Sequence, residues 1–283
     1  MDSRNPSLQR YTKFCIFVNM KKLTLSIVLF IACCLSFTAQ AQPSTWRPQP
    51  GEHTLKPSAC RPARSPYQGC KNYGKSIAVF GGSLSVNKES DAAKQIWADL
   101  LKAKVVTYGV GGAGFSCEQG YTLQKQVDTA DVFDVYVLWA STNDFNGNRP
   151  VGTWKDYTEA DGYDTSKLVT QCGGINYCIK KLREKNPSAQ IYFFTSLRFF
   201  GRDSGHNPFS TDVNQAGYTF ADYVQGQIDC CRYHGVAVLD QFSVQDIDEH
   251  NYELFYLPDK LHMNEDGYRR IGPVQAAFLA NGR

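Results

Sequence analysis

The 283-residue chain lacks the features that several large protein classes require. Beyond residue 41 it carries 25 basic and 26 acidic residues, so that part has a net charge of −1. Because it lacks the dense Lys and Arg that binding to a phosphate backbone needs, the sequence predicts no nucleic-acid partner. It has no CxxC pair and its five His are scattered, which argues against a zinc site. No repeat of fixed period is visible, which excludes a solenoid.

The N-terminal region has the pattern of a secretory signal peptide. Lys21-Lys22 precedes an apolar run at 23–37, and Ala39-Gln40-Ala41 follows it. The run is shorter than the roughly 20 apolar residues that a spanning helix needs. We therefore expect cleavage after Ala41, a secreted or periplasmic protein, and no stable membrane span.

Two points about this region stay open. The signal pattern begins directly after Met20, whereas the chain begins at Met1. Either methionine is therefore a candidate for the start of translation. Lipid attachment at Cys33 or Cys34 is the less favoured alternative to cleavage, because the residues before them match a lipoprotein signal poorly.

Cysteine usage fits an oxidising compartment, in which several thiols would pair as disulfides. The shortest loops to close are Cys60–Cys70 and Cys172–Cys178, although connectivity cannot be read from sequence. Because seven cysteines lie beyond residue 41, at least one thiol stays unpaired. The seven cysteines beyond residue 41 are Cys60, Cys70, Cys117, Cys172, Cys178, Cys230 and Cys231.

The rest of the chain divides into an irregular arm and one domain. Residues 42–74 are rich in Pro, Arg and Ser without periodicity, which predicts an arm over the surface, pinned by Cys60 and Cys70. With 42% hydrophobic residues overall, the chain is suited to a sizeable core, and the domain is expected at 75–283.

Short apolar runs alternate with helical patterns through this domain. The runs lie at 76–80, 105–107, 132–140, 191–194 and 236–239. The helical patterns lie at 93–101, in a stretch ending near 185, at 220–233 and after 264. Unbroken apolar strands that alternate with helices indicate a parallel sheet covered on both faces. The sequence predicts a three-layer α/β/α sandwich with a five-stranded parallel sheet.

Polar residues follow these strands in an order that suggests chemistry. Ser83 follows the first run within Gly81-Gly82-Ser83-Leu84-Ser85, Gly112 lies in the glycine-rich segment after the second, and Asn143 follows the third. Asp259 and His262 precede the last helix. Because ligands bind beyond the carboxyl ends of parallel strands, we expect these residues at one rim.

Together they supply the parts that ester hydrolysis by a serine requires. Ser83 would be the nucleophile, His262 its base, and Asp259 the acceptor that orients the imidazole. The oxyanion hole would consist of the backbone N–H groups of Ser83 and Gly112 and the side-chain amide of Asn143.

This ordered set resembles the SGNH (GDSL-type) hydrolase family, whose four blocks centre on Ser, Gly, Asn and His. The first block matches except that Gly82 stands where the family usually has Asp. Gly112, Asn143-Asp144 and Asp259-Lys260-Leu261-His262 match the others. The resemblance implies a flavodoxin-like fold and an exported carboxylic ester hydrolase. The chemistry proposed for Ser83 and His262 requires no metal or organic cofactor.

Two further segments match motifs that compete with this interpretation. Asp203 and His206 have the same spacing as Asp259 and His262 and follow the fourth strand, so they are the alternative base pair. The segment 69–76 fits the GxxxxGK[ST] phosphate-loop pattern, but an irregular arm precedes it and a strand, not a helix, is expected after it.

The long connections at 146–163 and 199–220 are rich in aromatic residues, which suit either sugar rings or core packing. These are Trp154, Tyr157, Tyr163, Phe199, Phe200, Phe209 and Tyr218. The resemblance implies acyl removal from glycans or lipids, and we expect an acetyl ester of a carbohydrate as substrate. The alternatives are a lipid ester, a catalytically silent glycan-binding protein on the same fold, and a flavodoxin-like cofactor binder. Oligomeric state is not readable.

Overall fold

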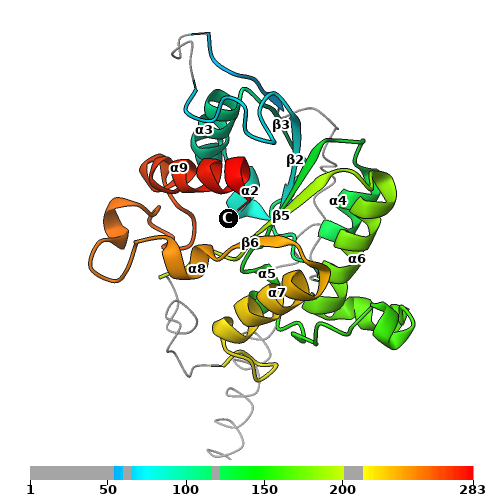
Figure 1. Cartoon of the computed structure of the whole chain (residues 1–283). Coiled ribbons are helices and arrows are strands. Elements are labelled where there is room, and N and C mark those ends of the chain that lie inside the picture. The colour runs from blue at the N-terminus through cyan, green and yellow to red at the C-terminus, as the bar shows by residue number, and fades with distance from the viewer. Residues whose placement is uncertain (1–53, 60–64, 117–121, 201–212, 283) are drawn as a thin grey trace, which may run out of the picture. The chain divides into compact units, whose positions relative to one another are not determined.

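The computed structural model describes residues 54–59, 65–116, 122–200 and 213–282. A sheet in the order β1-β3-β2-β4-β5-β6 lies at the centre of this part of the chain (Figure 1). The strands are β1 (Thr54–Leu55), β2 (Ser76–Gly81), β3 (Lys104–Thr107), β4 (Val135–Trp139), β5 (Gln190–Phe194) and β6 (Ala237–Leu239). All neighbours pair in parallel except β1 with β3, so the carboxyl ends of five strands meet at one rim.

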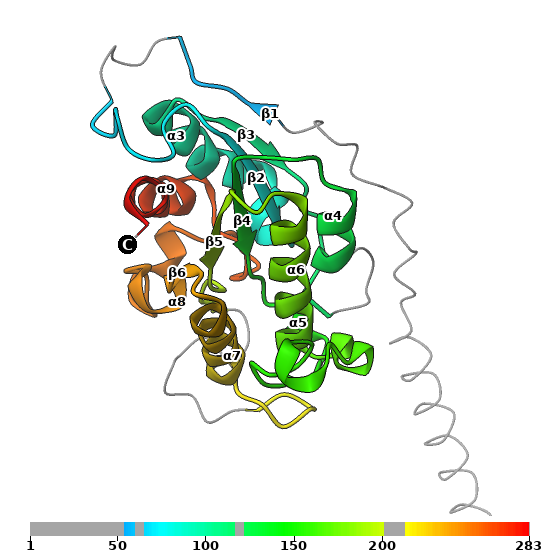
Figure 2. The same cartoon turned by 45° about the vertical axis from the view of Figure 1, so that its right-hand side comes forward.

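Helices cover both faces of the sheet, as Figures 1 and 2 show. Ile77 and Val79 of β2 pack in the core beneath α3 and α9, whereas Ala78 and Phe80 pack beneath α4, α6 and α7. This alternation follows from the two-residue period of a strand. The helices are α2 (Ser83–Val86), α3 (Asp91–Leu101), α4 (Leu123–Thr129), α5 (Asn143–Asn146), α6 (Gln171–Lys185), α7 (Phe220–His234), α8 (Gln241–Val244) and α9 (Glu265–Asn281), with 3-10 turns η1 (Lys88–Ser90), η2 (Glu159–Asp161), η3 (Thr165–Val169) and η4 (Tyr252–Leu254). The predicted three-layer α/β/α sandwich is confirmed.

The sheet has six strands, so the prediction of five was wrong by one edge strand. β1 comes from the predicted arm and pairs antiparallel with β3, Thr54 opposite Val106 and Leu55 opposite Val105. Two residues carry no readable side-chain period, and an edge strand pairs through its backbone alone. The arm is also fastened by Ser58, whose N–H and hydroxyl both donate to Asp99 Oδ1 at 2.7 and 2.9 Å.

The structure contradicts the disulfide prediction for the cysteines that it describes. Cys70, Cys172, Cys178, Cys230 and Cys231 all carry free thiols. Cys172 and Cys178 both lie in α6, where six residues rise by about 9 Å, more than a disulfide spans. Cys60 and Cys117, and with them the proposed pinning of the arm, lie outside the described residues.

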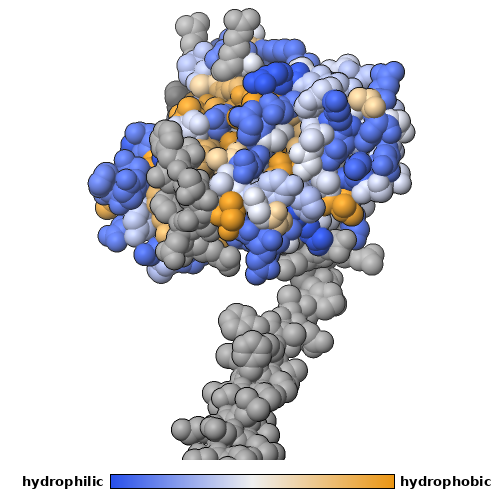
Figure 3. All heavy atoms as spheres, turned by 90° about the horizontal axis from the view of Figure 1, so that it is seen from below, coloured by the Kyte–Doolittle hydropathy of each residue, from blue (hydrophilic) through white to orange (hydrophobic). Residues whose placement is uncertain are grey.

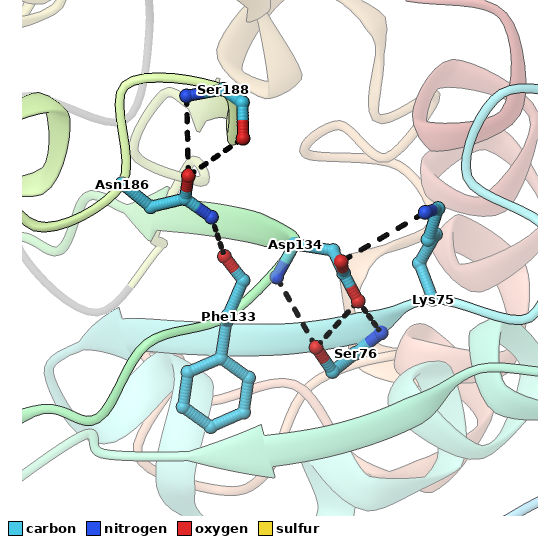
Figure 4. Close-up of polar contacts among 6 residues, drawn as sticks. All are labelled: Lys75, Ser76, Phe133, Asp134, Asn186 and Ser188. Atoms are coloured by element: carbon cyan, nitrogen blue, oxygen red, sulfur yellow. Dashed lines mark hydrogen bonds and ion pairs between the residues drawn. The ribbon is translucent and has the colours of Figure 1, made fainter.

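At the amino ends of the strands, Asp134 occupies the position before β4 and joins it to β2 (Figure 4). Its carboxylate accepts hydrogen bonds from the N–H and hydroxyl of Ser76 at 2.9 and 2.8 Å, and Lys75 Nζ lies 3.8 Å away. The two bonds from Ser76 lower the pKa of Asp134. The phosphate-loop pattern at 69–76 thus ends at the first residue of β2, at the edge opposite the carboxyl ends of the parallel strands.

The described residues include no membrane-spanning helix and several exposed apolar side chains. Within the described ranges no helix is both long and apolar enough to cross a membrane, and the run at 23–37 lies outside them. Among the exposed large apolar residues, Val244 of α8 and Val274 of α9 line one pocket, whereas Val132 lies before β4. On the face in Figure 3, apolar residues gather at the upper left, whereas most of the rest of this face is hydrophilic.

Candidate active site

Ser83, His262 and Asp259 form a continuous hydrogen-bonded chain at the carboxyl rim. Ser83 Oγ lies 2.8 Å from His262 Nε2, and His262 Nδ1 lies 2.6 Å from Asp259 Oδ2. An ionised carboxylate only accepts, so Nδ1 carries the proton and the unprotonated Nε2 faces the serine hydroxyl. The structure thus brings together the three side chains that the sequence singled out.

The loop before α9 places His262 through its own backbone bonds. Leu257 N donates to His262 O at 2.8 Å, and Lys260 N donates to Leu257 O at 2.9 Å. Lys260 has a φ of 57°, which tightens the turn. Phe200 N, in the loop after β5, donates to Lys260 O at 2.7 Å. These bonds hold the imidazole over the end of β2.

Asp259 is both a structural and an electrostatic partner of His262. Its Oδ1 accepts from the backbone N–H groups of Leu261 and His262, both at 3.0 Å. Burial raises the pKa of Asp259, but the hydrogen bonds from His262 and Leu261 outweigh it and leave the pKa below its ordinary value. The carboxylate therefore stays ionised beside the imidazole at neutral pH.

The turn that carries Ser83 is held by two buried side chains from other elements. Gln126 of α4 accepts from Gly81 N and donates to Gly81 O, both at 3.0 Å, and so continues the ladder at the end of β2. Lys94 of α3 donates to Ser85 O at 2.8 Å and pairs with Asp91 at 2.9 Å. Burial lowers the pKa of Lys94, although Asp91 opposes the shift.

Three further groups surround the serine. Within the described ranges, the backbone N–H groups of Ser83 and Gly112 donate no hydrogen bond. Gly112 has a φ of +80°, a conformation that favours glycine. Asn143 Nδ2 would lie only 2.7 Å from a Cβ built on Gly82, so this amide is next to the nucleophile's turn.

Asp144 fixes the segment that follows Gly112. Its buried carboxylate accepts from Phe115 N at 2.8 Å and from the N–H and hydroxyl of Ser116, both at 2.9 Å. Sequence reasoning matched Asp144 to the third block without giving it this role. No sequence pattern indicates Gln126 or Lys94, because buried polar residues on neighbouring elements leave no local pattern.

The remaining candidates contribute less to the site. Asp203 and His206 lie outside the described residues. Phe199 is buried against Phe145 and Phe220 and so belongs to the core, whereas Trp154 is 37% exposed. Among the described residues, no three His, Cys, Asp or Glu side chains are grouped to hold a metal ion.

Known structures share this fold. One crystal structure is 25% identical with a TM-score of 0.62, over 72% of this chain and 95% of its own. A protein from Lactobacillus plantarum is 19% identical with a TM-score of 0.59, over 72% of this chain and 96% of its own. A possible lipase from Chitinophaga pinensis is 18% identical with a TM-score of 0.52, over 72% and 98%.

No curated protein sequence matches the chain significantly. The model of the GDSL-like lipase/acylhydrolase family matches residues 73–270, which includes Ser83, Gly112, Asn143 and the loop with Asp259 and His262. This match spans more than half of the sequence. The chain therefore belongs to the GDSL-like lipase/acylhydrolase family, which makes it an ester hydrolase.

Proposed function

We propose that this protein is an exported serine esterase that hydrolyses carboxylic esters, with Ser83 as nucleophile, His262 as general base and acid, and Asp259 as the orienting carboxylate. The observation that carries the proposal is the continuous chain from Ser83 Oγ through His262 to Asp259 at 2.8 and 2.6 Å. Each link has the reach that proton transfer requires.

The reaction follows from this geometry in two halves. Ser83 Oγ attacks the ester carbonyl carbon while its proton passes to His262 Nε2, which gives a tetrahedral oxyanion. The oxyanion collapses, the bond to the alcohol oxygen breaks, and His262 returns its proton to the departing alcohol. Water then attacks the acyl-serine and gives a proton to His262. The second collapse breaks the bond to Ser83 Oγ, which takes that proton back from His262, and the acid is released.

The oxyanion would be bound by the N–H groups of Ser83 and Gly112 and by the side-chain amide of Asn143. The two backbone donors are free of other hydrogen bonds in the described part of the chain, which supports this role. Removing one such donor typically lowers turnover about 100- to 1000-fold, so Asn143→Ala tests the third member directly.

We propose an acetyl ester on a carbohydrate as substrate. The site is open, since Ser83 is partly exposed and the Asp259 side chain is 48% exposed, so a bulky sugar alcohol can approach. Export, proposed from the Lys21-Lys22 signal pattern and cleavage after Ala41, would bring the enzyme to extracellular glycans.

A chromogenic acetate ester tests the chemistry, and a panel of acetylated polysaccharides and emulsified long-chain lipid esters tests the substrate. We expect hydrolysis by the wild type that Ser83→Ala abolishes, and acetate release from a polysaccharide. Equal rates for both proteins would favour the silent glycan-binding alternative, and preference for the long-chain ester would favour a lipase.

A further inference from the structure

Three polar groups form a cluster behind the nucleophile's turn. Asn143 Nδ2 donates to Ala113 O at 2.8 Å and lies 3.0 Å from Ser141 Oγ, which itself donates to Ala113 O at 2.8 Å. Ser141 is 5% exposed, so water competes little for its hydroxyl. Only the nitrogen of the amide can donate to a carbonyl, so these contacts also fix which way the Asn143 side chain faces.

The geometry allows one N–H of Asn143 to remain unused. The three distances form a triangle, and by the law of cosines the two oxygens subtend an angle of about 58° at Nδ2. The two N–H bonds of a planar amide diverge by about 120°. One hydrogen placed between Ala113 O and Ser141 Oγ can therefore serve both oxygens, and in that arrangement the second hydrogen points away from both.

Gly82 shows where this cluster lies and why the position has no side chain. A Cβ on Gly82 would be 2.6 Å from Ala113 O, 2.7 Å from Asn143 Nδ2 and 2.9 Å from Ser141 Cβ. Its φ of −93° suits any residue, so space and not backbone conformation requires glycine. The cluster occupies the volume that the usual Asp of the first block would need.

We propose that Ser141 is a positioning residue for the oxyanion hole: its hydroxyl holds one N–H of Asn143 against Ala113 O and thereby directs the other toward the ester oxyanion. Ser141 acts through Asn143 and does not touch substrate. This inference rests on the proposed serine-esterase function. It also links the cluster to Gly82, the position at which the first block lacks its usual Asp.

A double-mutant cycle with Ser141→Ala and Asn143→Ala, assayed with the chromogenic acetate ester, tests the proposal. We expect S141A to lower kcat about 10-fold with KM changed less than about twofold, because one orienting hydrogen bond is lost. In the N143A background, S141A should change kcat less than about twofold, since the group that it positions is gone. Ser141→Cys, which fills the same space with a weak hydrogen-bonding group, should behave like S141A and serves if S141A does not fold.

Thr142→Val is the matched control. Thr142 is equally buried and adjacent, but its hydroxyl accepts from Asn146 Nδ2 at 3.0 Å and does not contact Asn143. T142V should keep wild-type kcat. Wild-type kcat in S141A, or an equal loss in both backgrounds, would overturn the positioning role while leaving the esterase proposal standing. Failure of the esterase proposal would show instead as no difference between wild type and S83A.

Discussion

Ser83 and His262 are 179 positions apart in the chain, yet Ser83 Oγ and His262 Nε2 lie 2.8 Å from each other. Ser83 begins α2 after the central strand β2, whereas His262 precedes α9. Tyr268, fully buried in α9, joins the two segments by donating its hydroxyl to Leu84 O at 2.7 Å. The distance between Ser83 and His262 therefore depends on how α9 packs against α2.

Replacing Tyr268 by Phe should weaken this connection. The change leaves Leu84 O without the hydroxyl donor, which costs about 1 to 3 kcal/mol of folding free energy. We also expect a several-fold fall in kcat, because His262 is less well held. Urea unfolding and ester kinetics measure the two effects. Tyr177→Phe, which removes an exposed hydroxyl bond to Asp128 (2.9 Å), is the control and should retain kcat. Unchanged kcat in Y268F would show that the hydrogen bond from Tyr268 to Leu84 does not contribute to catalysis.

The lowered pKa of Asp259 predicts how stability depends on pH. The unfolded carboxyl titrates near about 3.9 and the folded one below that value, so between the two the unfolded chain binds more protons and stability rises with pH. The contribution of Asp259 is thus complete above the unfolded pKa and is lost as pH falls through the folded pKa. We expect Asp259→Asn to lower Tm near neutral pH, with the difference from wild type vanishing in strong acid. A difference independent of pH would mean that the charge of Asp259 does not stabilise the fold.

Gly82→Ala should impair catalysis without unfolding the protein. Its methyl group would approach Ala113 O and Asn143 Nδ2 to 2.6 and 2.7 Å, so the amide must shift. We expect kcat to fall at least about 10-fold, the size of effect that a misplaced oxyanion donor produces. Gly111→Ala is the matched control, since a Cβ there meets open space. Equal activity of G82A and G111A would show that the space behind Gly82 is not restricted.

Gln126→Leu should destabilise the end of β2. The side-chain amide accepts from the N–H of buried Gly81 and shares its carbonyl with Val110 N, so the substitution leaves the N–H without this partner. We expect a loss of about 1 to 3 kcal/mol in the free energy of unfolding, the cost of one unsatisfied buried group, together with reduced kcat. A loss below about 0.5 kcal/mol in urea unfolding would be inconsistent with this role.

Most of the sheet was predictable because its strands are buried on both faces and so appear as unbroken apolar runs. The run at 132–140 starts as a strand only at Val135, since Val132 is 65% exposed and Asp134 is engaged with Ser76. The seven-residue α4 was not predicted, because it is too short for a clear period.

The chemistry-bearing residues of the site were predictable from their order after the strands, and the groups that hold them were not. Gln126 and Lys94 bond to residues of other segments, so their roles exist only in three dimensions. The arm was predicted as irregular because its sequence has no side-chain period. β1 is only two residues long and pairs through its backbone, so it leaves no such pattern.

The most direct test of the central claim is to label the protein with a fluorophosphonate, which reacts with an activated serine, and to locate the label by peptide mass spectrometry. The account predicts a single modified residue, Ser83, with labelling abolished in His262→Ala although Ser83 is still present. A label on another serine, or undiminished labelling of Ser83 in H262A, would contradict it.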